Sequence, residues 1–231
     1  MATKKFCVIG LGYFGLNLAL RLAEAGAEVI AIDNRPEAVE KVSAAVTLGV
    51  CLNATDSTAL KNLGLDSMDA VIVAIGEGFE SSIMTTAHLQ ELGIKKIYNH
   101  VTSPVHERLL KLMNIDELLV PEEEAAAHLA NRLMLPGLLE VFKISNEYGI
   151  YEIKTPEQFI GKSLVELNLR QNYSLNLITI KTETAAKKLL TLGQKEKYVI
   201  QGVPTPDTKI QKNDILVLFG VEKKVKELLE L

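Results

Sequence analysis

The sequence has no tryptophan, and aromatic residues make up only 5% of its 231 residues. It has two cysteines, Cys7 and Cys51, and both lie in apolar runs typical of strands. These positions predict buried thiols and argue against a disulfide or a metal pair. The longest apolar runs, such as Ala70 to Ile75, fall far short of the roughly 20 residues that a membrane helix needs. Because no apolar signal region precedes the first strand, we expect a soluble cytoplasmic protein.

The sequence also lacks the clustered positive charge that a nucleic-acid-binding surface requires. The net charge is −4 with 23% charged residues, and no basic stripe alternates with aromatic side chains. Nucleic-acid recognition therefore has no electrostatic basis here. Hydrophobic residues make up 48% of the chain, which is enough for one large domain or two smaller ones.

Strand-like and helical segments alternate regularly from Lys5 to about Leu135. Six short apolar runs predict strands: FCVIG, EVIAID, GVCL, AVIVAI, KIYNHV and ELLV. The helices between them carry start signals, with Pro36 in a first turn and Ser103 as a cap before Pro104. This alternation predicts an α/β fold with a doubly wound, Rossmann-like parallel sheet.

The alternation stops at Leu135-Pro136-Gly137, since proline and glycine together end a helix. We therefore expect two domains, residues 1–135 and residues 136–231. The second has the strand-like runs YGIYEIK, LNLITIK, KYVI and ILVLFG, a short helix after IGKSLVEL and a final amphipathic helix, which predict a small α+β domain. The polar segment from Lys181 to Pro206 is typical of a long hairpin or a flexible excursion.

A glycine-rich turn follows the first strand and opens a helix. The pattern is Gly10-x-Gly12-x-x-Gly15, and Asp33 ends the next strand. Gly10 permits the tight turn, Gly12 lets backbone approach a pyrophosphate, and Gly15 allows close helix packing. Asp33 would accept hydrogen bonds from ribose hydroxyls and repel a 2′-phosphate, which favours NAD(H) or an adenine nucleotide over NADP. The alternative is that these glycines only make a tight turn.

Other polar segments follow neighbouring strands, at the edge where such folds bind ligands. Arg35 comes just after Asp33 and can reach a phosphate or ribose, or can be a solvated turn residue. Asn53 to Asp56 can bring polar groups to an adenine, although Asp56 serves equally well as a helix N-cap. Ala74 to Ser82 contains glycines that permit close approach to a ligand.

An enzyme would need reacting groups beside this pocket. The four histidines are His88, His100, His106 and His128. His88, His106 and His128 fall on predicted helices, where packing is their simplest role. His100 lies near the end of the fifth strand and is the best catalytic candidate. No metal-ligand cluster, nucleophile elbow or phosphate-binding loop of the ATPase type stands in the sequence. The pocket is therefore interpreted as a sensor, with an NAD-dependent oxidoreductase as the alternative.

These segments resemble the cytosolic regulators of potassium uptake systems of the TrkA and KtrA type, which are built from RCK N- and C-domains. The resemblance rests on VIGLGYFG, NATD, DAVIVAIGE and VTSPVHERLLKLMNIDELLVPE, followed by GKSLVELNLR, NLITIK and DILVLFG. It implies a non-enzymatic gating subunit at the inner face of the cell membrane, with dimers assembled into a ring, often of eight subunits, beneath a potassium-translocating integral membrane subunit. It also implies that ATP against ADP, or NADH against NAD, changes the ring shape and hence ion flux.

The resemblance assigns nucleotide-binding roles to positions of this sequence. They are Gly10, Gly12, Tyr13, Phe14 and Gly15 at the turn, Asp33, Asn34 and Arg35 at the ribose, Asn53, Ala54, Thr55 and Asp56 near the adenine, and Ile75, Gly76 and Glu77 at the pocket edge. In ATP-gated relatives the position of Tyr13 often holds an arginine. Tyrosine supplies no charge for a γ-phosphate, which weakens the case for ATP and strengthens that for NAD(H).

Two further sites follow from the same resemblance. Glu122 matches a glutamate that helps to hold a cation between ATP phosphates of neighbouring subunits, or it is a helix N-terminal carboxylate favoured by the dipole. In the second domain some relatives bind cyclic di-AMP at a dimer interface. The corresponding positions are Leu164, Val165, Leu169, Arg170 and Asn176, for which a plain dimer surface is the alternative.

The apolar stripe in AAAHLANRLMLPGLLEVF predicts a helix that crosses over to a partner subunit. The leading hypothesis is thus a ring-forming, nucleotide-switched regulator of potassium flux. The competing hypotheses are the oxidoreductase and a free-standing cytosolic sensor without a membrane partner.

Overall fold

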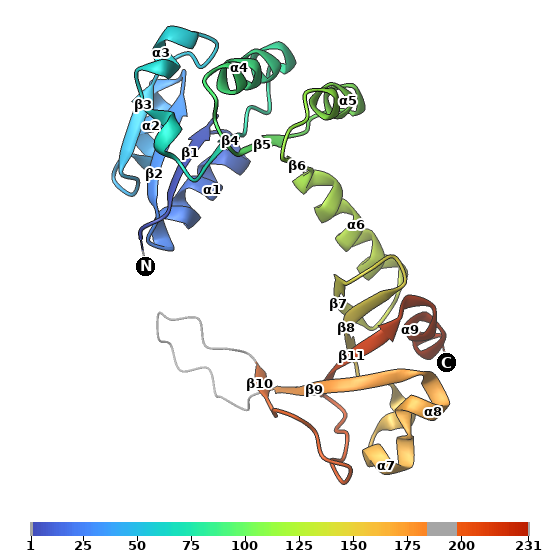
Figure 1. Cartoon of the computed structure of the whole chain (residues 1–231). Helices are drawn as coiled ribbons and strands as arrows, with labels where there is room; N and C mark the ends of the chain where they lie inside the picture. Colours follow the sequence, from blue (N-terminus) through green and yellow to red (C-terminus); the bar gives the residue numbers. More distant parts are fainter. Residues whose placement is uncertain (1, 184–197, 231) are drawn as a thin grey trace. The chain divides into compact units, whose positions relative to one another are not determined.

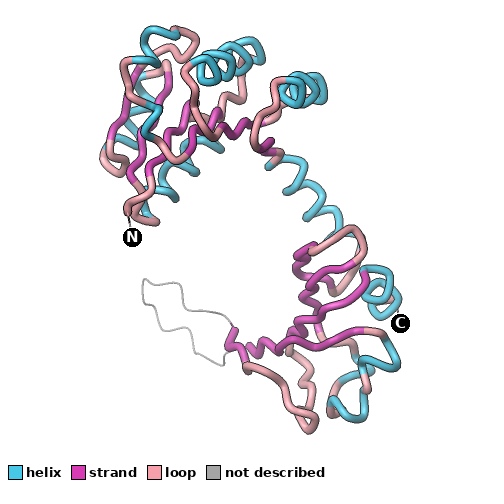
Figure 2. Tube along the Cα trace, viewed as in Figure 1, coloured by secondary structure: helices cyan, strands magenta, loops and turns pink. Residues whose placement is uncertain are grey.

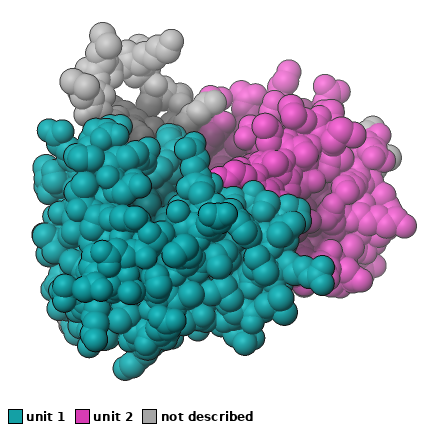
Figure 3. All heavy atoms as spheres, turned by 90° about the horizontal axis from the view of Figure 1, so that it is seen from above, with its two compact units in different colours: residues 1–121 teal, residues 122–231 magenta. Residues whose placement is uncertain are grey.

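The structure of the chain is a computed structural model that describes residues 2–183 and 198–230. The chain divides into two compact units, Met1–Pro121 and Glu122–Leu231, which are coloured separately in Figure 3. The helix α6 (Pro121–Met134) begins at this division. The domain boundary predicted after residue 135 stays a prediction.

The first unit is built on a six-stranded parallel sheet in the order β3-β2-β1-β4-β5-β6. Its strands are β1 (Lys5–Ile9), β2 (Glu28–Asp33), β3 (Leu48–Cys51), β4 (Ala70–Val73), β5 (Ile97–His100) and β6 (Glu117–Leu119). All six coincide with the predicted runs, and the order is that of a doubly wound dinucleotide-binding fold. The predicted fold class is confirmed for this unit.

Helices cover both faces of this sheet (Figure 1). They are α1 (Tyr13–Glu24), α2 (Pro36–Ser43), α3 (Ser57–Lys61), α4 (Phe79–Glu91) and α5 (Pro104–Leu112). Alternate residues of β1 enter different cores. Val8 packs with buried residues of α1 and α2, whereas Cys7 and Ile9 pack with those of α3 and α4. A strand that is buried on both faces must be apolar throughout, which explains the continuous apolar runs.

The helix start signals act as expected. Pro36 is the first residue of α2, where its missing N–H leaves no bond unmade. Ser103 precedes Pro104, and its hydroxyl accepts a hydrogen bond from the His106 N–H at 3.2 Å. Both predicted starts are confirmed.

The second unit carries a five-stranded antiparallel sheet in the order β10-β9-β11-β8-β7, whose strands are magenta in Figure 2. They are β7 (Leu138–Lys143), β8 (Tyr148–Lys154), β9 (Leu175–Glu183), β10 (Tyr198–Ile200) and β11 (Ile215–Val221). With α6, the helices are α7 (Leu164–Leu167), α8 (Leu169–Tyr173) and α9 (Glu222–Leu229). The predicted α+β character is confirmed.

One core supports this second sheet. Ile153 of β8 and Leu216 and Leu218 of β11 are fully buried and pack with Val225 of α9 and Phe159. Burial alternates along β8, as expected for a sheet with a single packed face.

The strand β7 was not predicted, and it takes up the end of the apolar stripe AAAHLANRLMLPGLLEVF, whose first part is α6. The helix end predicted at Leu135-Pro136-Gly137 is confirmed. The helix α6 ends at Met134, because Pro136 cannot continue the hydrogen-bond ladder and Gly137 adopts a positive φ of 95°. The residues that follow then pair with β8, and Leu138 joins the core.

The predicted excursion between Lys181 and Pro206 falls largely outside the described residues. At its two ends Lys181 pairs with Ile200 and Glu183 with Tyr198, in an antiparallel ladder.

Cys7 and Cys51 occupy different environments, and neither forms a disulfide. Cys7 is completely buried, which raises the pKa of its thiol. Cys51 is exposed, so the prediction that it is buried is wrong. It lies on β3, an edge strand of the sheet. Among the described residues, no helix combines the length and the apolar character needed to span a bilayer.

The core assigned to the second unit can be tested by replacing a buried valine and an exposed valine with alanine. Val225→Ala removes methyl groups that are 1% exposed and should lower the free energy of unfolding by about 2 kcal/mol, because a cavity remains. Val203 is 89% exposed, so Val203→Ala should change it by less than about 0.5 kcal/mol. Urea unfolding measures both, and equal effects would contradict the assigned core.

Candidate functional site

The glycine-rich turn joins β1 to α1 by close backbone contacts. Gly10 has a φ of 96°, and a Cβ built there would lie 2.9 Å from backbone atoms of Ala74 and Ile75. A Cβ at Gly15 would overlap the Gly10 carbonyl oxygen. Only glycine fits at either position, so both are required by the fold itself, whether or not a ligand binds.

Gly12 differs from these two glycines. Its φ of −65° suits any residue, and none of the described atoms lies within 4 Å of a Cβ built on it. Gly12 is the N-cap of α1, so the first-turn N–H groups of a 12-residue helix begin beside this open position. A helix N-terminus with open space above it suits a phosphate, because the free N–H groups and the dipole both favour negative charge.

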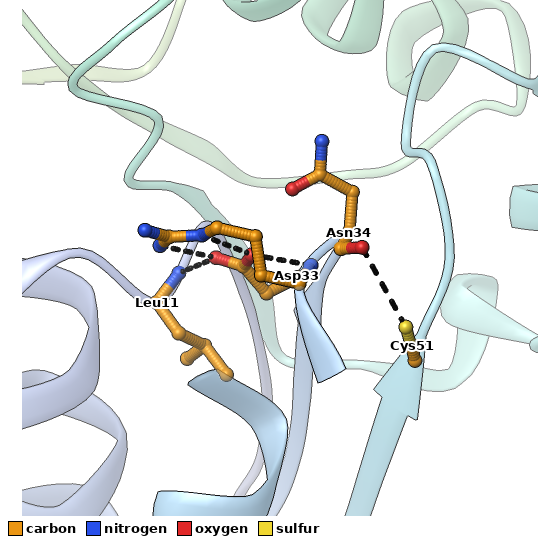
Figure 4. A network of polar contacts seen from close by, with 5 residues as sticks. Leu11, Asp33, Asn34 and Cys51 are labelled. Carbon is orange, nitrogen blue, oxygen red and sulfur yellow. Dashed lines mark hydrogen bonds and ion pairs between the residues drawn. The ribbon is translucent and has the colours of Figure 1, made fainter. Parts of the chain in front are cut away.

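Asp33 stands beside this turn at the end of β2. Its Oδ2 accepts the Leu11 N–H at 2.6 Å, and its Oδ1 accepts the Arg35 N–H at 2.9 Å. Figure 4 shows the Leu11 N–H directed at the Asp33 carboxylate. The Arg35 side chain adds bonds from Nε to Oδ1 at 3.0 Å and from Nη2 to Oδ2 at 3.2 Å. The carboxylate is thus anchored to both neighbouring loops.

These contacts set the ionisation of Asp33. Burial by itself would raise the pKa of the carboxyl group, but the hydrogen bonds from the Arg35 side chain and from the Leu11 and Arg35 N–H groups lower it, as does the Arg35 charge. The net pKa lies below the ordinary value of 3.8. Asp33 is therefore an anion at neutral pH, as an acceptor of ribose hydroxyls must be.

The loop after β3 carries the predicted adenine-side residues. Asp56 is the N-cap of α3, where its Oδ1 accepts the Thr58 N–H at 2.9 Å. The Asn53 Oδ1 accepts the Thr55 N–H and hydroxyl at 3.1 and 2.9 Å. Ala54 is buried. Of the two roles considered for Asp56, the structure shows the N-cap.

The loop after β4 lies against the glycine turn. The Ala74 N–H donates to the Ile9 carbonyl at 2.7 Å, and the backbone of Ala74 and Ile75 closes on Gly10. Gly76 and Glu77 follow and are exposed. The Glu77 carboxylate acts electrostatically on Arg35.

The strand order explains why these loops form one site. The strands β3, β2, β1 and β4 are consecutive neighbours, so their carboxyl ends share one edge of the sheet. All fifteen predicted nucleotide-binding residues, from Gly10 to Glu77, lie at that edge. It also contains the point between β1 and β4 where the strand order reverses, the usual ligand crevice of such sheets. The roles of the fifteen residues toward a nucleotide stay predictions.

Tyr13 and Phe14 begin α1 with different environments. Tyr13 is 93% exposed at the helix N-terminus. Phe14 is partly buried, and its ring lies 5.2 Å from that of His100 between centroids. His100 is itself buried at the end of β5. The structure thus places the best catalytic candidate in a buried position beside Phe14.

The other histidines lie on helices, as predicted. His88 of α4 makes a hydrogen bond from Nε2 to the Thr55 carbonyl at 3.2 Å. His106 of α5 is fully buried, and burial with the nearby His100 lowers its pKa. The Nε2 atom of His128, in α6, lies 3.5 Å from the Oε2 atom of Glu140. Within residues 2–183 and 198–230, no group of three or more His, Cys, Asp or Glu side chains could hold a metal ion.

The remaining predicted residues belong to the second unit. Glu122 lies in the first turn of α6 and is exposed. Arg170 donates from Nε to the Asn176 Oδ1, and Val165 is exposed, while Leu169 belongs to the core. Leu164 is partly buried against that core.

Sequence reasoning missed one contributor to the site, the Leu11 N–H. A main-chain donor carries no side-chain signal. Only its position between Gly10 and Gly12 could have indicated it.

Comparison with known proteins places the chain in a family. The family model of the TrkA-N domain matches residues 6–121, which is about half of the chain and includes the whole site. This chain belongs to the TrkA-N family. The chain is 34% identical to the Ktr system potassium uptake protein C of Bacillus subtilis over 217 residues, 94% of this chain and 92% of the relative. It is 31% identical to the Ktr system potassium uptake protein A of the same organism, over 96% of this chain and 94% of the relative.

Solved structures share the fold of this chain. The GsuK RCK domain superposes with a TM-score of 0.62 at 18% identity, over 100% of this chain and 48% of that one. A GsuK channel bound to NAD gives 0.60 at 18% identity, over 99% and 39%. The chain therefore spans less than half the length of those two structures, and at this identity the likeness concerns the fold alone.

The glycines Gly12 and Gly15 should differ in what their substitution damages. Gly15→Ala places a methyl group into the Gly10 carbonyl and should lower the free energy of unfolding by about 3 kcal/mol. Gly12→Ala meets open space and should cost less than about 1 kcal/mol. Thermal unfolding without nucleotide measures this contrast, and a large loss at Gly12 would contradict the open position.

The lowered pKa of Asp33 predicts a pH-dependent contribution to stability. Asp33→Asn should lower the free energy of unfolding by about 2 kcal/mol at pH 7, since charged hydrogen bonds are lost. The difference from wild type should be complete above about pH 4 and shrink as the pH falls through the lowered pKa. Urea unfolding from pH 7 to pH 3 measures it, with the exposed Asp66→Asn as control. A difference that persists unchanged at pH 3 would contradict the role of the charge.

Proposed function

We propose that this chain is a nucleotide-sensing regulatory subunit of a potassium channel or transporter. The observation that carries the proposal is the open N-terminus of α1 at Gly12 beside the buried, ionised Asp33. Phosphate would bind at the helix and ribose at the carboxylate. The relatives named as Ktr potassium uptake proteins, aligned over nearly the whole chain, support potassium flux as the process that is regulated.

The ligand is an adenine nucleotide, either NAD or NADH, or ADP or ATP. Tyr13 at the start of α1 offers a phenol and no charge to a terminal phosphate, which favours NAD(H) over ATP. If ATP binds, Glu122 is the residue proposed to hold a cation with it. In the second unit, cyclic di-AMP is the proposed second ligand, at the surface formed by Val165, Arg170 and Asn176 with Leu164 and Leu169 beneath it.

The mechanism is a population shift and involves no chemical step. The subunit forms dimers that assemble into a ring, an octamer by the family resemblance, at the cytoplasmic face of a potassium-translocating membrane subunit. Two nucleotides that differ in affinity for two ring shapes shift the balance between these shapes, and ion flux follows. A nucleotide with equal affinity for both shapes would change nothing, however tightly it bound.

The alternative, an NAD-dependent oxidoreductase, needs a proton donor or acceptor beside the nicotinamide. By its sequence position His100 is the best candidate for this proton donor or acceptor, but it is buried against Phe14. The arrangement around the turn therefore favours sensing over hydride transfer.

Nucleotide binding should raise the stability of the folded state. At a free concentration of 100 times the dissociation constant, the gain is about 2.7 kcal/mol. Thermal unfolding with NAD, NADH, ADP and ATP should show unequal shifts, and Gly12→Ala should abolish them while retaining the fold. Light scattering with and without the preferred nucleotide reports the assembly. Hydride transfer to any substrate of a panel, or a chain that none of the four nucleotides stabilises, would overturn the proposal.

A further inference from the structure

The carboxylate of Asp33 has no acceptor position left for a ligand. A carboxylate offers about four lone-pair positions. Leu11 N–H and Arg35 Nη2 bond to Oδ2, and Arg35 N–H and Nε bond to Oδ1, at 2.6, 3.2, 2.9 and 3.0 Å. These four donors match the four positions. Any ribose hydroxyl that is to bond to Asp33 must therefore displace a donor already there.

The four donors differ in how easily they can leave. The N–H groups of Leu11 and Arg35 belong to the glycine turn and to the chain after β2, so they move only with the backbone. The other two belong to the Arg35 guanidinium, whose side chain is 53% exposed, whereas that of Asp33 is 6% exposed. A half-exposed, long side chain can rotate into solvent at small cost.

The two guanidinium donors match the two hydroxyl groups of a ribose, because both present a pair of hydrogen-bond donors to the carboxylate. The guanidinium presents two parallel N–H donors to the two carboxylate oxygens. A ribose 2′,3′-diol also presents two donors, and a carboxylate at the end of the second strand is where a dinucleotide-binding fold receives it. Arg35 therefore stands in the place of the diol.

Two carboxylates besides Asp33 act electrostatically on Arg35. The pKa of Arg35 is raised chiefly by the hydrogen bond and charge of Asp33, and further by Glu37 and by Glu77. Glu37 lies in the first turn of α2, next in sequence to Pro36. Glu77 comes from the loop after β4, on the other side of the glycine turn. A guanidinium that leaves Asp33 thus stays under the influence of two further carboxylates.

We infer that Arg35 is the selectivity gate of this pocket. In this structure it fills the two positions of Asp33 that a ribose diol needs, and a bound diol displaces its guanidinium into solvent. The inference rests on the proposed nucleotide function and adds its ligand requirement: the gate opens for a sugar with both hydroxyl groups, and a sugar without them leaves it closed.

The test compares ADP with 2′,3′-dideoxy-ADP by isothermal titration calorimetry. The two ligands carry the same phosphates and base, so the ratio of their affinities isolates the diol. Arg35→Ala removes the competitor and should raise this ratio about five-fold, which is what a half-exposed ion pair is worth. The control is Arg21→Ala, because Arg21 is an exposed arginine of the same unit that pairs with Glu24. It removes the same charge and should leave the ratio unchanged.

The outcomes separate the gate from the function on which it rests. A ratio that is unchanged or lower in Arg35→Ala overturns the gate alone, and weaker binding of both ligands with an unchanged ratio would make Arg35 an ordinary phosphate contact. Failure of wild type and Arg35→Ala to bind ADP, ATP, NAD or NADH would overturn the nucleotide function together with the gate.

Discussion

The hydrogen bond from the Leu11 N–H to the Asp33 carboxylate holds the candidate site together. It ties the glycine turn after β1 to the end of β2 at 2.6 Å, in a place where Asp33 is nearly inaccessible to water. A buried carboxylate without donors would be costly, so the turn and the acid require each other. Together with the Arg35 side chain, whose hydrogen bonds have the larger effect, this bond lowers the pKa of Asp33 and keeps the carboxylate ionised. The capacity of this edge for ribose thus depends on the contacts that Asp33 makes with Leu11 and Arg35.

The two units use different means to bury their strands. In the first, α1 and α2 cover one face of the sheet and α3 and α4 the other, so successive residues of β1 enter different cores. In the second, a single core lies on one face of an antiparallel sheet. A parallel sheet gathers all its strand ends at one edge, and this is why the first unit carries the loops of a nucleotide site. The second unit presents exposed apolar side chains such as Phe142 and Val165.

Much of the first unit could be predicted because its signals are local. Apolar runs of four to six residues marked all six strands, Pro36 and Ser103 marked helix starts, and the glycine spacing marked the turn. The second unit was harder. The sequence marked the end of the helix at Pro136-Gly137 but gave no strand signal for Leu138–Lys143, which became a strand through its pairing with β8. Cys51 was predicted to be buried because its run is apolar. That run forms β3, and only the assembled sheet shows that β3 lies at the edge, where Cys51 stays exposed.

The sequence by itself determined the order of the elements, the glycine turn and the acid at the end of the second strand. These depend on backbone sterics and on the period of apolar residues, which act over a few positions. Only the tertiary structure decided that Asp56 caps a helix, that His100 packs against Phe14 and that the Arg35 guanidinium donates hydrogen bonds to the Asp33 carboxylate. These contacts join residues whose side chains have several possible partners. The choice among such partners is made by burial and geometry after the chain has folded.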